Sequence, residues 1–143
     1  IPVDPSYLSF AAENAGIEAS FIDLANEINL EMPSYVANRI ANEVGGLNGK
    51  SVLVVGISYK ANVSDLRESP SLLLINALKI LGANVSWHDP LVGNYQGEQS
   101  TEIGSYDVAI LAVAHDVIKI ENIKTCAPYI FDCTGTIHGA NGL

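Results

Sequence analysis

The sequence predicts an α/β fold in which parallel strands and helices form three layers, preceded by a helical segment. After residue 50, short apolar runs rich in β-branched residues alternate with helical patterns, as is typical of parallel strands joined by crossover helices. Before residue 45 only helical periodicity occurs. Three glycines fall within residues 45–49, where a helix cannot continue. We therefore expect one part at residues 1–46 and another at 47–143.

The helical segment is predicted to contain three helices. Asp4 and Pro5 resemble an N-cap followed by a proline at the first helical position, and that helix should end at Gly16. A second helix is expected from Ser20, and Pro33 should break or kink it before a third. The second helix carries an apolar stripe of Phe21, Leu24, Ala25, Ile28 and Met32.

The α/β part is predicted to have four buried strands. A serine and a proline at 69–70 should begin the main crossover helix, which ends at Gly82, and a weak helix is expected at 117–126. The segment 91–105 is polar and contains glycine, so we expect a loop. The strands are expected at residues 51–56, 83–90, 107–113 and 129–133.

Composition excludes several classes of protein. The 143 residues include seven basic and sixteen acidic side chains, giving a net charge of −9, so nucleic acid and anionic membranes are poor partners. No apolar run is long enough to cross a bilayer, and the start lacks the features of a signal peptide, so we expect a soluble, cytoplasmic protein. Because the chain begins with isoleucine, we expect a piece of a longer protein. Cys126 and Cys133 lack metal-ligand spacing, so we expect reduced thiols and no metal.

The connection at residues 56–71 is unusually long and charged for the link between a strand and a helix. It contains one glycine, the G-x-G-x-x-G pattern is absent, and Asp89 lies too far along to be the usual ribose ligand, so we expect no standard dinucleotide site. Lys60 and Arg67 could instead bind a diphosphate at the carboxyl ends of the strands. The alternative is a solvated loop whose charges pair loosely with each other.

Two motifs in this chain resemble one known family. The stretch G-I-S-Y-K-A-N-V-S-D-L-R-E-S-P-S at 56–71 closely resembles the signature of the nucleotide-sugar 6-dehydrogenases, the UDP-glucose/GDP-mannose dehydrogenase family. The start, I-P-V-D-P-S-Y-L, is similar to the segment behind that family's catalytic cysteine, in the form of the UDP-N-acetylhexosamine branch. The resemblance extends over W-H-D-P and almost the whole chain. It implies that residues 1–46 are the tail of a helical, dimer-forming middle domain and that 47–143 form a Rossmann-like UDP-sugar-binding domain.

The resemblance assigns roles to four residues. Asp4 matches an aspartate that positions or activates water for thioester hydrolysis, Tyr59 and Lys60 match a pair that contacts the nucleotide sugar, and Arg67 matches an arginine that reaches NAD. The alternatives are an N-cap for Asp4, plain packing for Tyr59 and a surface ion pair for Arg67. A further substrate-binding arginine, expected after the last strand, is not found in DCTGTIHGANGL.

The implied enzyme oxidises a UDP-(N-acetyl)hexosamine or UDP-glucose to the uronic acid in two hydride transfers to NAD through a cysteine thioester. The implied nucleophile would precede Ile1, and NAD would be bound mainly by a domain outside these residues, so we expect this piece to bind the UDP-sugar and to be inactive alone. We expect a homodimer. A non-catalytic Rossmann-like nucleotide-binding or dimerisation module is the alternative, and a pure interaction domain is a weaker one.

The remaining polar residues are interpreted as structural. His88, His115 and His138 have no spacing that suggests a shared ligand. Asp107 and Asp132 flank predicted strands, where we expect them to cap turns or loops.

Overall fold

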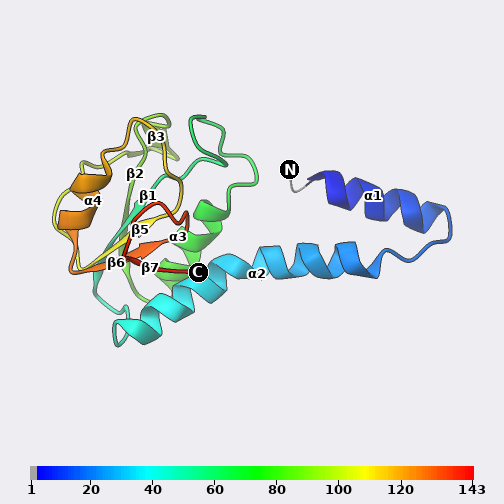
Figure 1. Ribbon diagram of the computed structural model, residues 1–143, viewed down its shortest axis with the longest axis horizontal. Coiled ribbons are helices and arrows are strands. Elements are labelled where there is room, and N and C mark those ends of the chain that lie inside the picture. Colours follow the sequence, from blue (N-terminus) through cyan, green and yellow to red (C-terminus); the bar gives the residue numbers. More distant parts are fainter. Residues whose placement is uncertain (1–2) are drawn as a thin grey trace.

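The computed structural model describes residues 3–143, and side chains from residue 5 onward (Figure 1). Two helices come first, and strands and helices then alternate to the end of the chain. In order, the elements are α1 (Val3–Asn14), α2 (Ser20–Glu43), β1 (Ser51–Val55), α3 (Pro70–Ile80), β2 (Asn84–His88), β3 (Asn94–Tyr95), β4 (Glu98–Gln99), β5 (Val108–Leu111), α4 (Ile120–Cys126), β6 (Tyr129–Asp132) and β7 (Asn141–Gly142).

The centre of the fold is a five-stranded parallel sheet in the order β2-β1-β5-β6-β7. Figure 1 shows α4 on one side of this sheet and α2 and α3 on the other. Alternate residues of β1 and β5 enter two separate hydrophobic clusters, one below α2 and α3 and one below α4. Both faces of these strands are therefore covered, which explains their continuous apolar sequences. The predicted three-layer α/β fold is confirmed.

Four local predictions need correction. Pro33 lies inside α2, which continues to Glu43, so there is no separate third helix in the described residues. The loop predicted at 91–105 contains the two-residue strands β3 and β4, which pair antiparallel. The last residues add β7 beside β6, a fifth strand in the sheet. The first helix includes Val3 and Asp4, so Asp4 does not precede the helix as an N-cap would.

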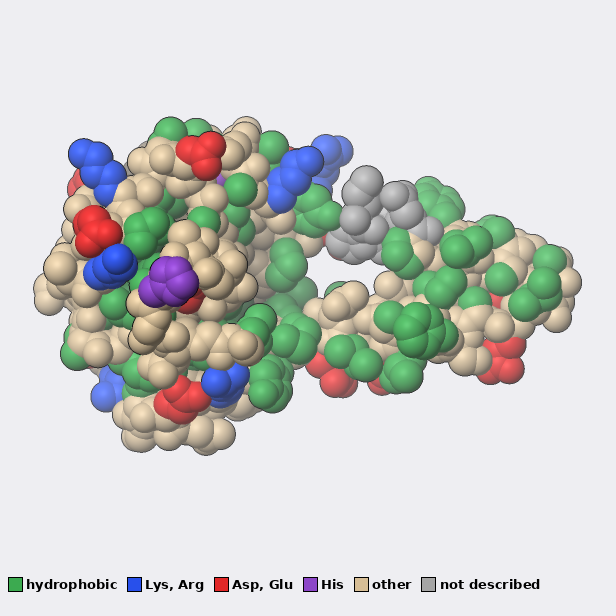
Figure 2. All heavy atoms as spheres, in the orientation of Figure 1, with side chains coloured by type: hydrophobic (Ala, Val, Ile, Leu, Met, Phe, Trp, Pro, Cys, Tyr) green, Lys and Arg blue, Asp and Glu red, His purple; other side chains and the backbone are tan. Residues whose placement is uncertain are grey.

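The two halves of α2 have different environments. In the second half, Val36, Ala37 and Ile40 are buried in the cluster shared with β1, α3 and β6. In the first half, apolar side chains are exposed, among them Phe21 at 83% and Leu24 at 53%. Figure 2 shows hydrophobic side chains on the surface of the arm formed by α1 and the first half of α2. Within the described residues, no helix is long and apolar enough to span a membrane.

A polar cluster joins the end of α2 to β6. The Tyr129 hydroxyl donates a hydrogen bond to Glu43 Oε2 at 2.6 Å, and Arg39 Nε donates to Glu43 Oε1 at 2.9 Å. The Arg39 guanidinium also lies 5.4 Å from the centre of the Phe131 ring. Burial and the neighbouring Glu43 carboxylate raise the pKa of Tyr129, so the phenol remains a donor at neutral pH.

Candidate functional site

The candidate site begins where β1 ends. Gly56 has φ +79°. A Cβ added there would lie 2.2 Å from the carbonyl oxygen of Val113, a residue in the segment that follows β5. Only glycine fits this backbone and this close approach. The connection therefore leaves β1 in contact with the segment that follows β5, at the carboxyl edge of the sheet, where open α/β sheets bind ligands.

Hydrogen bonds close the long connection into a compact loop. The Tyr59 N–H donates to the Asp65 carbonyl at 2.7 Å, and the Ser58 hydroxyl donates to the Lys60 carbonyl at 3.0 Å. Ser69 occupies the predicted N-cap position of α3, but its hydroxyl makes no capping bond and instead donates to the Ile57 carbonyl at 2.7 Å. The serine thus ties the start of α3 to the end of β1.

A buried aspartate and histidine lie beneath this loop. Asp89 follows β2, and its Oδ2 accepts hydrogen bonds from the N–H groups of Ile57 at 2.9 Å and Ser58 at 3.2 Å. His115 follows β5, and its Nε2 lies 3.1 Å from both Asp89 Oδ2 and Ser58 Oγ. His115 Nδ1 accepts the Asn62 N–H at 2.8 Å, so Nε2 carries the hydrogen that is shared with Asp89 and Ser58.

The electrostatics of this cluster favour an ionised Asp89. Burial raises the pKa of Asp89, but the hydrogen bonds from Ile57 and His115 outweigh burial, and the net pKa is lowered. Both side chains are fully buried. The sequence led us to interpret His115 as a structural histidine, and in the structure its ring is hydrogen-bonded to three residues, Ser58, Asp89 and Asn62. The sequence signal for this cluster was that Asp89 directly follows β2 and that His115 comes shortly after β5, the two strands that flank β1.

The predicted ligand-binding residues of the loop lie at or near its surface. Tyr59 is half-buried and Lys60 is exposed. No described carboxylate lies within salt-bridge distance of the Lys60 ammonium. Lys60 therefore presents an uncompensated positive charge at the carboxyl edge of the sheet. Asp4 lies in the first turn of α1, and its side chain is outside the part that the structure describes.

Arg67 forms the surface ion pair that was the alternative to a ligand role. Its Nη2 lies 2.6 Å from Asp65 Oδ2, and its side chain is 88% exposed. The hydrogen bonds from Arg67 lower the pKa of Asp65 to about 2. This pair uses Nε and one terminal nitrogen of the guanidinium, so the remaining donors face solvent. Arg67 and Lys60 belong to the same loop, across which the Tyr59 N–H donates to the Asp65 carbonyl.

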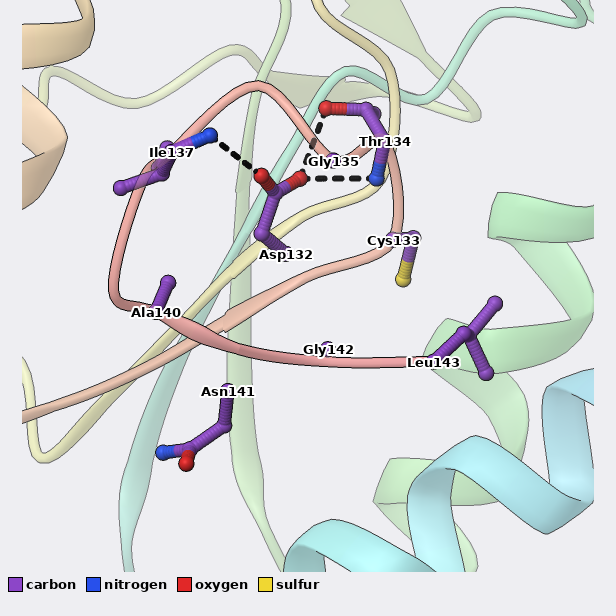
Figure 3. A pocket seen from close by; sticks show the side chains of 9 residues that line it. All are labelled: Asp132, Cys133, Thr134, Gly135, Ile137, Ala140, Asn141, Gly142 and Leu143. Carbon is purple, nitrogen blue, oxygen red and sulfur yellow. Dashed lines mark hydrogen bonds between the residues drawn. The ribbon is translucent and has the colours of Figure 1, made fainter.

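A shallow pocket lies at the carboxyl end of β6 (Figure 3). Its volume is about 260 Å³, and it contains no lysine, arginine or histidine. The Asp132 carboxylate accepts the N–H groups of Thr134 at 2.7 Å and Ile137 at 2.6 Å, which confirms that it caps this loop. Burial and the adjacent Asp132 raise the pKa of the Cys133 thiol to about 11, so the thiol is protonated at neutral pH. A pocket without a cation is poorly suited to a diphosphate by itself.

Other expectations for polar residues had mixed outcomes. Asp107 binds the N–H and hydroxyl of Ser51 on the neighbouring strand β1 instead of capping its own turn. Cys126 is buried and Cys133 is half-buried, and both are free thiols, as expected. Among the described residues, no three acidic, histidine or cysteine side chains are grouped as metal ligands.

Taken together, the fold and this edge define a parallel α/β domain whose first crossover loop offers a fixed backbone and an exposed cation. Comparison with known structures supports that class. A UDP-glucose dehydrogenase from Pyrobaculum islandicum matches with a TM-score of 0.78 at 25% identity, over 92% of this chain and 32% of that one. A UDP-D-ManNAc dehydrogenase from Pyrococcus horikoshii shares the fold, with a TM-score of 0.72 over 99% of this chain and 37% of that one, at 22% identity.

The chain belongs to the UDP-glucose/GDP-mannose dehydrogenase family, whose UDP-binding domain model matches residues 53–139. A UDP-N-acetyl-D-mannosamine dehydrogenase of Methanococcus maripaludis is 36% identical over 124 residues, which cover 83% of this chain and 28% of that protein. The chain thus spans less than a third of the length of these curated relatives. The family resemblance expected from the two sequence motifs is confirmed.

Proposed function

We propose that this chain binds the UDP part of a nucleotide sugar, with Lys60 as a phosphate contact and Tyr59 beside the nucleotide sugar. The observation that carries the proposal is the unpaired Lys60 ammonium on a hydrogen-bonded loop at the carboxyl edge of the family's UDP-binding domain. In a chain with a net charge of −9, an anionic ligand needs such a local positive charge.

The experiment is a titration of the 143-residue chain with UDP, followed by NMR chemical shifts, which detect weak binding. Lys60→Ala should weaken saturable UDP binding by about tenfold or more, in line with the loss of a charged hydrogen bond. Lys79→Ala is the matched control, because Lys79 is also exposed but lies in the last turn of α3, toward the opposite edge of the sheet. Equal effects of the two substitutions, or no saturable binding by the unaltered chain, would contradict the proposal.

We further propose that the chain is the carboxyl-terminal part of an NAD-dependent UDP-sugar 6-dehydrogenase, located in the cytoplasm. That enzyme would oxidise a UDP-(N-acetyl)hexosamine or UDP-glucose to the uronic acid by two hydride transfers through a cysteine thioester. Residues 1–46 would be the tail of the dimer-forming middle domain and 47–143 the UDP-sugar domain. Asp4 would position or activate the hydrolytic water. The exposed apolar residues of α1 and α2 support a homodimer.

The described residues do not fit NAD as a site of their own. The loop after β1 has one glycine, and the space beside that Gly56 is filled by the Val113 backbone. We therefore propose that NAD is held mainly by another part of the enzyme, with Arg67 reaching toward it. The chain alone should not oxidise UDP-N-acetylmannosamine with NAD, and measurable oxidation would contradict this assignment. The enzyme proposal also requires G-G-x-C directly before Ile1 in the complete gene; the non-catalytic binding module does not.

A further inference from the structure

Asn62 is anchored by three hydrogen bonds in the loop that carries Lys60. Its backbone is left-handed, with φ 64°, a conformation that costs free energy unless contacts hold it. Its N–H donates to His115 Nδ1 at 2.8 Å. Its side-chain amide donates to Asp116 Oδ2 at 3.0 Å and accepts the Asp116 N–H at 2.9 Å. Two consecutive residues after β5 therefore hold one exposed residue of a loop that follows β1.

His115 is itself fixed from below. Its buried Nε2 contacts Asp89 Oδ2 and Ser58 Oγ, each at 3.1 Å. The same Ser58 hydroxyl donates to the Lys60 carbonyl at 3.0 Å. The Lys60 backbone is thus held on one side by Ser58 and, two residues later, by the His115 contact to Asn62.

We propose that His115 and Asp116 are positioning residues for UDP binding, which act on the ligand through Asn62 and Lys60 without touching it. This inference rests on the proposed function of Lys60. A flexible lysine loses conformational freedom when it binds an anion, and a backbone that is already fixed lowers that cost. Releasing Asn62 should therefore weaken UDP binding even when the domain stays folded.

Two substitutions of His115 separate its two contacts. In His115→Asn, the side-chain oxygen lies near the position of Nδ1 and can still accept the Asn62 N–H. In His115→Gln, the terminal amide lies near the position of Nε2 and can still donate to Asp89, but the acceptor for Asn62 is lost. Both variants alter the same buried side chain, so a purely structural role predicts similar losses of stability and unchanged UDP affinity for the folded chain. His138→Gln, at an exposed histidine in another loop, is the matched control.

The measurements are UDP affinity by NMR titration, amide hydrogen exchange at residue 62 and urea unfolding, all on the 143-residue chain. We expect His115→Gln to weaken UDP binding about five- to tenfold and to speed exchange at Asn62, as the loss of one partly buried hydrogen bond predicts. His115→Asn should stay within about twofold of the unaltered chain, because the bond to Asn62 persists.

A third variant guards against a failure of the buried substitutions to fold. Asn62→Gly keeps the left-handed backbone and its N–H but removes both contacts to Asp116, and residue 62 is exposed. It should weaken UDP binding about two- to fivefold. Faster exchange at Asn62 with unchanged UDP affinity would overturn the inference, as would equal losses of affinity in His115→Asn and His115→Gln. Unchanged hydrogen exchange at residue 62 in His115→Gln would show that His115 does not fix Asn62, whether or not UDP binds. Absence of UDP binding by the unaltered chain would instead refute the proposed function.

Discussion

Gly56 offers a direct test of how the site is attached to the sheet. An alanine there would place its Cβ 2.2 Å from the Val113 carbonyl oxygen and 2.7 Å from the Val113 Cβ, while the backbone stays at φ +79°. The left-handed backbone costs about 1–2 kcal/mol for a residue with a side chain. Overpacking against a backbone that cannot withdraw adds about 1–3 kcal/mol. Gly56→Ala should therefore lower the free energy of unfolding by about 2–5 kcal/mol in total.

Gly93→Ala is the matched control. Gly93 has φ +68°, but a Cβ added there meets nothing within 4 Å. Its replacement should cost only the backbone part, about 1–2 kcal/mol. Urea unfolding of the two variants, with equal m-values, gives the difference that belongs to the contact between Gly56 and Val113.

The comparison has a clear refuting result. If Gly56→Ala and Gly93→Ala lower the free energy of unfolding equally, then disturbing the contact between Gly56 and the segment after β5 has no effect on stability. The argument that this contact fixes the start of the loop would then be wrong. If Gly56→Ala is the more destabilised and also binds UDP more weakly, the contact supports both the fold and the site.

Two further predictions concern the helical part and the surface ion pair. Removing residues 1–32 should leave a folded domain, whereas removing residues 1–46 should unfold it, because the loss of each large buried side chain costs about 2–5 kcal/mol. Circular dichroism during unfolding of the two truncated chains tests this prediction. If both chains lose equal helix per residue removed and both still unfold cooperatively, the prediction is wrong. The side chains lost from the core in the longer truncation are Val36, Ala37 and Ile40. The Asp65 carboxyl should titrate near 2 by NMR. Because its pKa is depressed in the folded chain, its contribution to folding stability is complete above the ordinary value of 3.8 and is lost as the pH falls from 3.8 toward 2. A midpoint near 3.8 would show that Asp65 does not hold the Arg67 side chain.

The elements that could be predicted were those with a long periodic signal. The strands β1 and β5 are apolar without interruption because both faces of the sheet are covered, and this pattern is visible in the sequence alone. The strands β3, β4 and β7 have two residues each, too few to show any period. Pro33 misled the prediction because packing of the following turns into the core outweighs the one hydrogen bond that proline removes.

The position of the site could be predicted from the sequence, but the hydrogen bonds that hold its loop could not. The length and charge of the loop at 56–71 marked it, since a connection between a strand and a helix is usually short. The contacts beneath it join residues that are far apart in the sequence, with Ser58 and His115 separated by 57 positions. Such contacts depend on the order of the strands, which the sequence pattern leaves open. Once the order β2-β1-β5 is known, Asp89 and His115 must lie on either side of the end of β1.

The ion pair of Arg67 does not decide against a ligand role for that residue. Asp65 holds the guanidinium through Nε and one terminal nitrogen, and the Arg67 side chain is 88% exposed. Exposed ion pairs contribute little to stability, so a phosphate of a bound anion can replace the carboxylate at small cost. The contact also keeps the guanidinium close to the loop that carries Lys60, since Asp65 is bonded to Tyr59 across that loop. We therefore propose that the surface pair and the cofactor contact are two alternative states of the Arg67 side chain, with Asp65 bonded to it when no anion is bound.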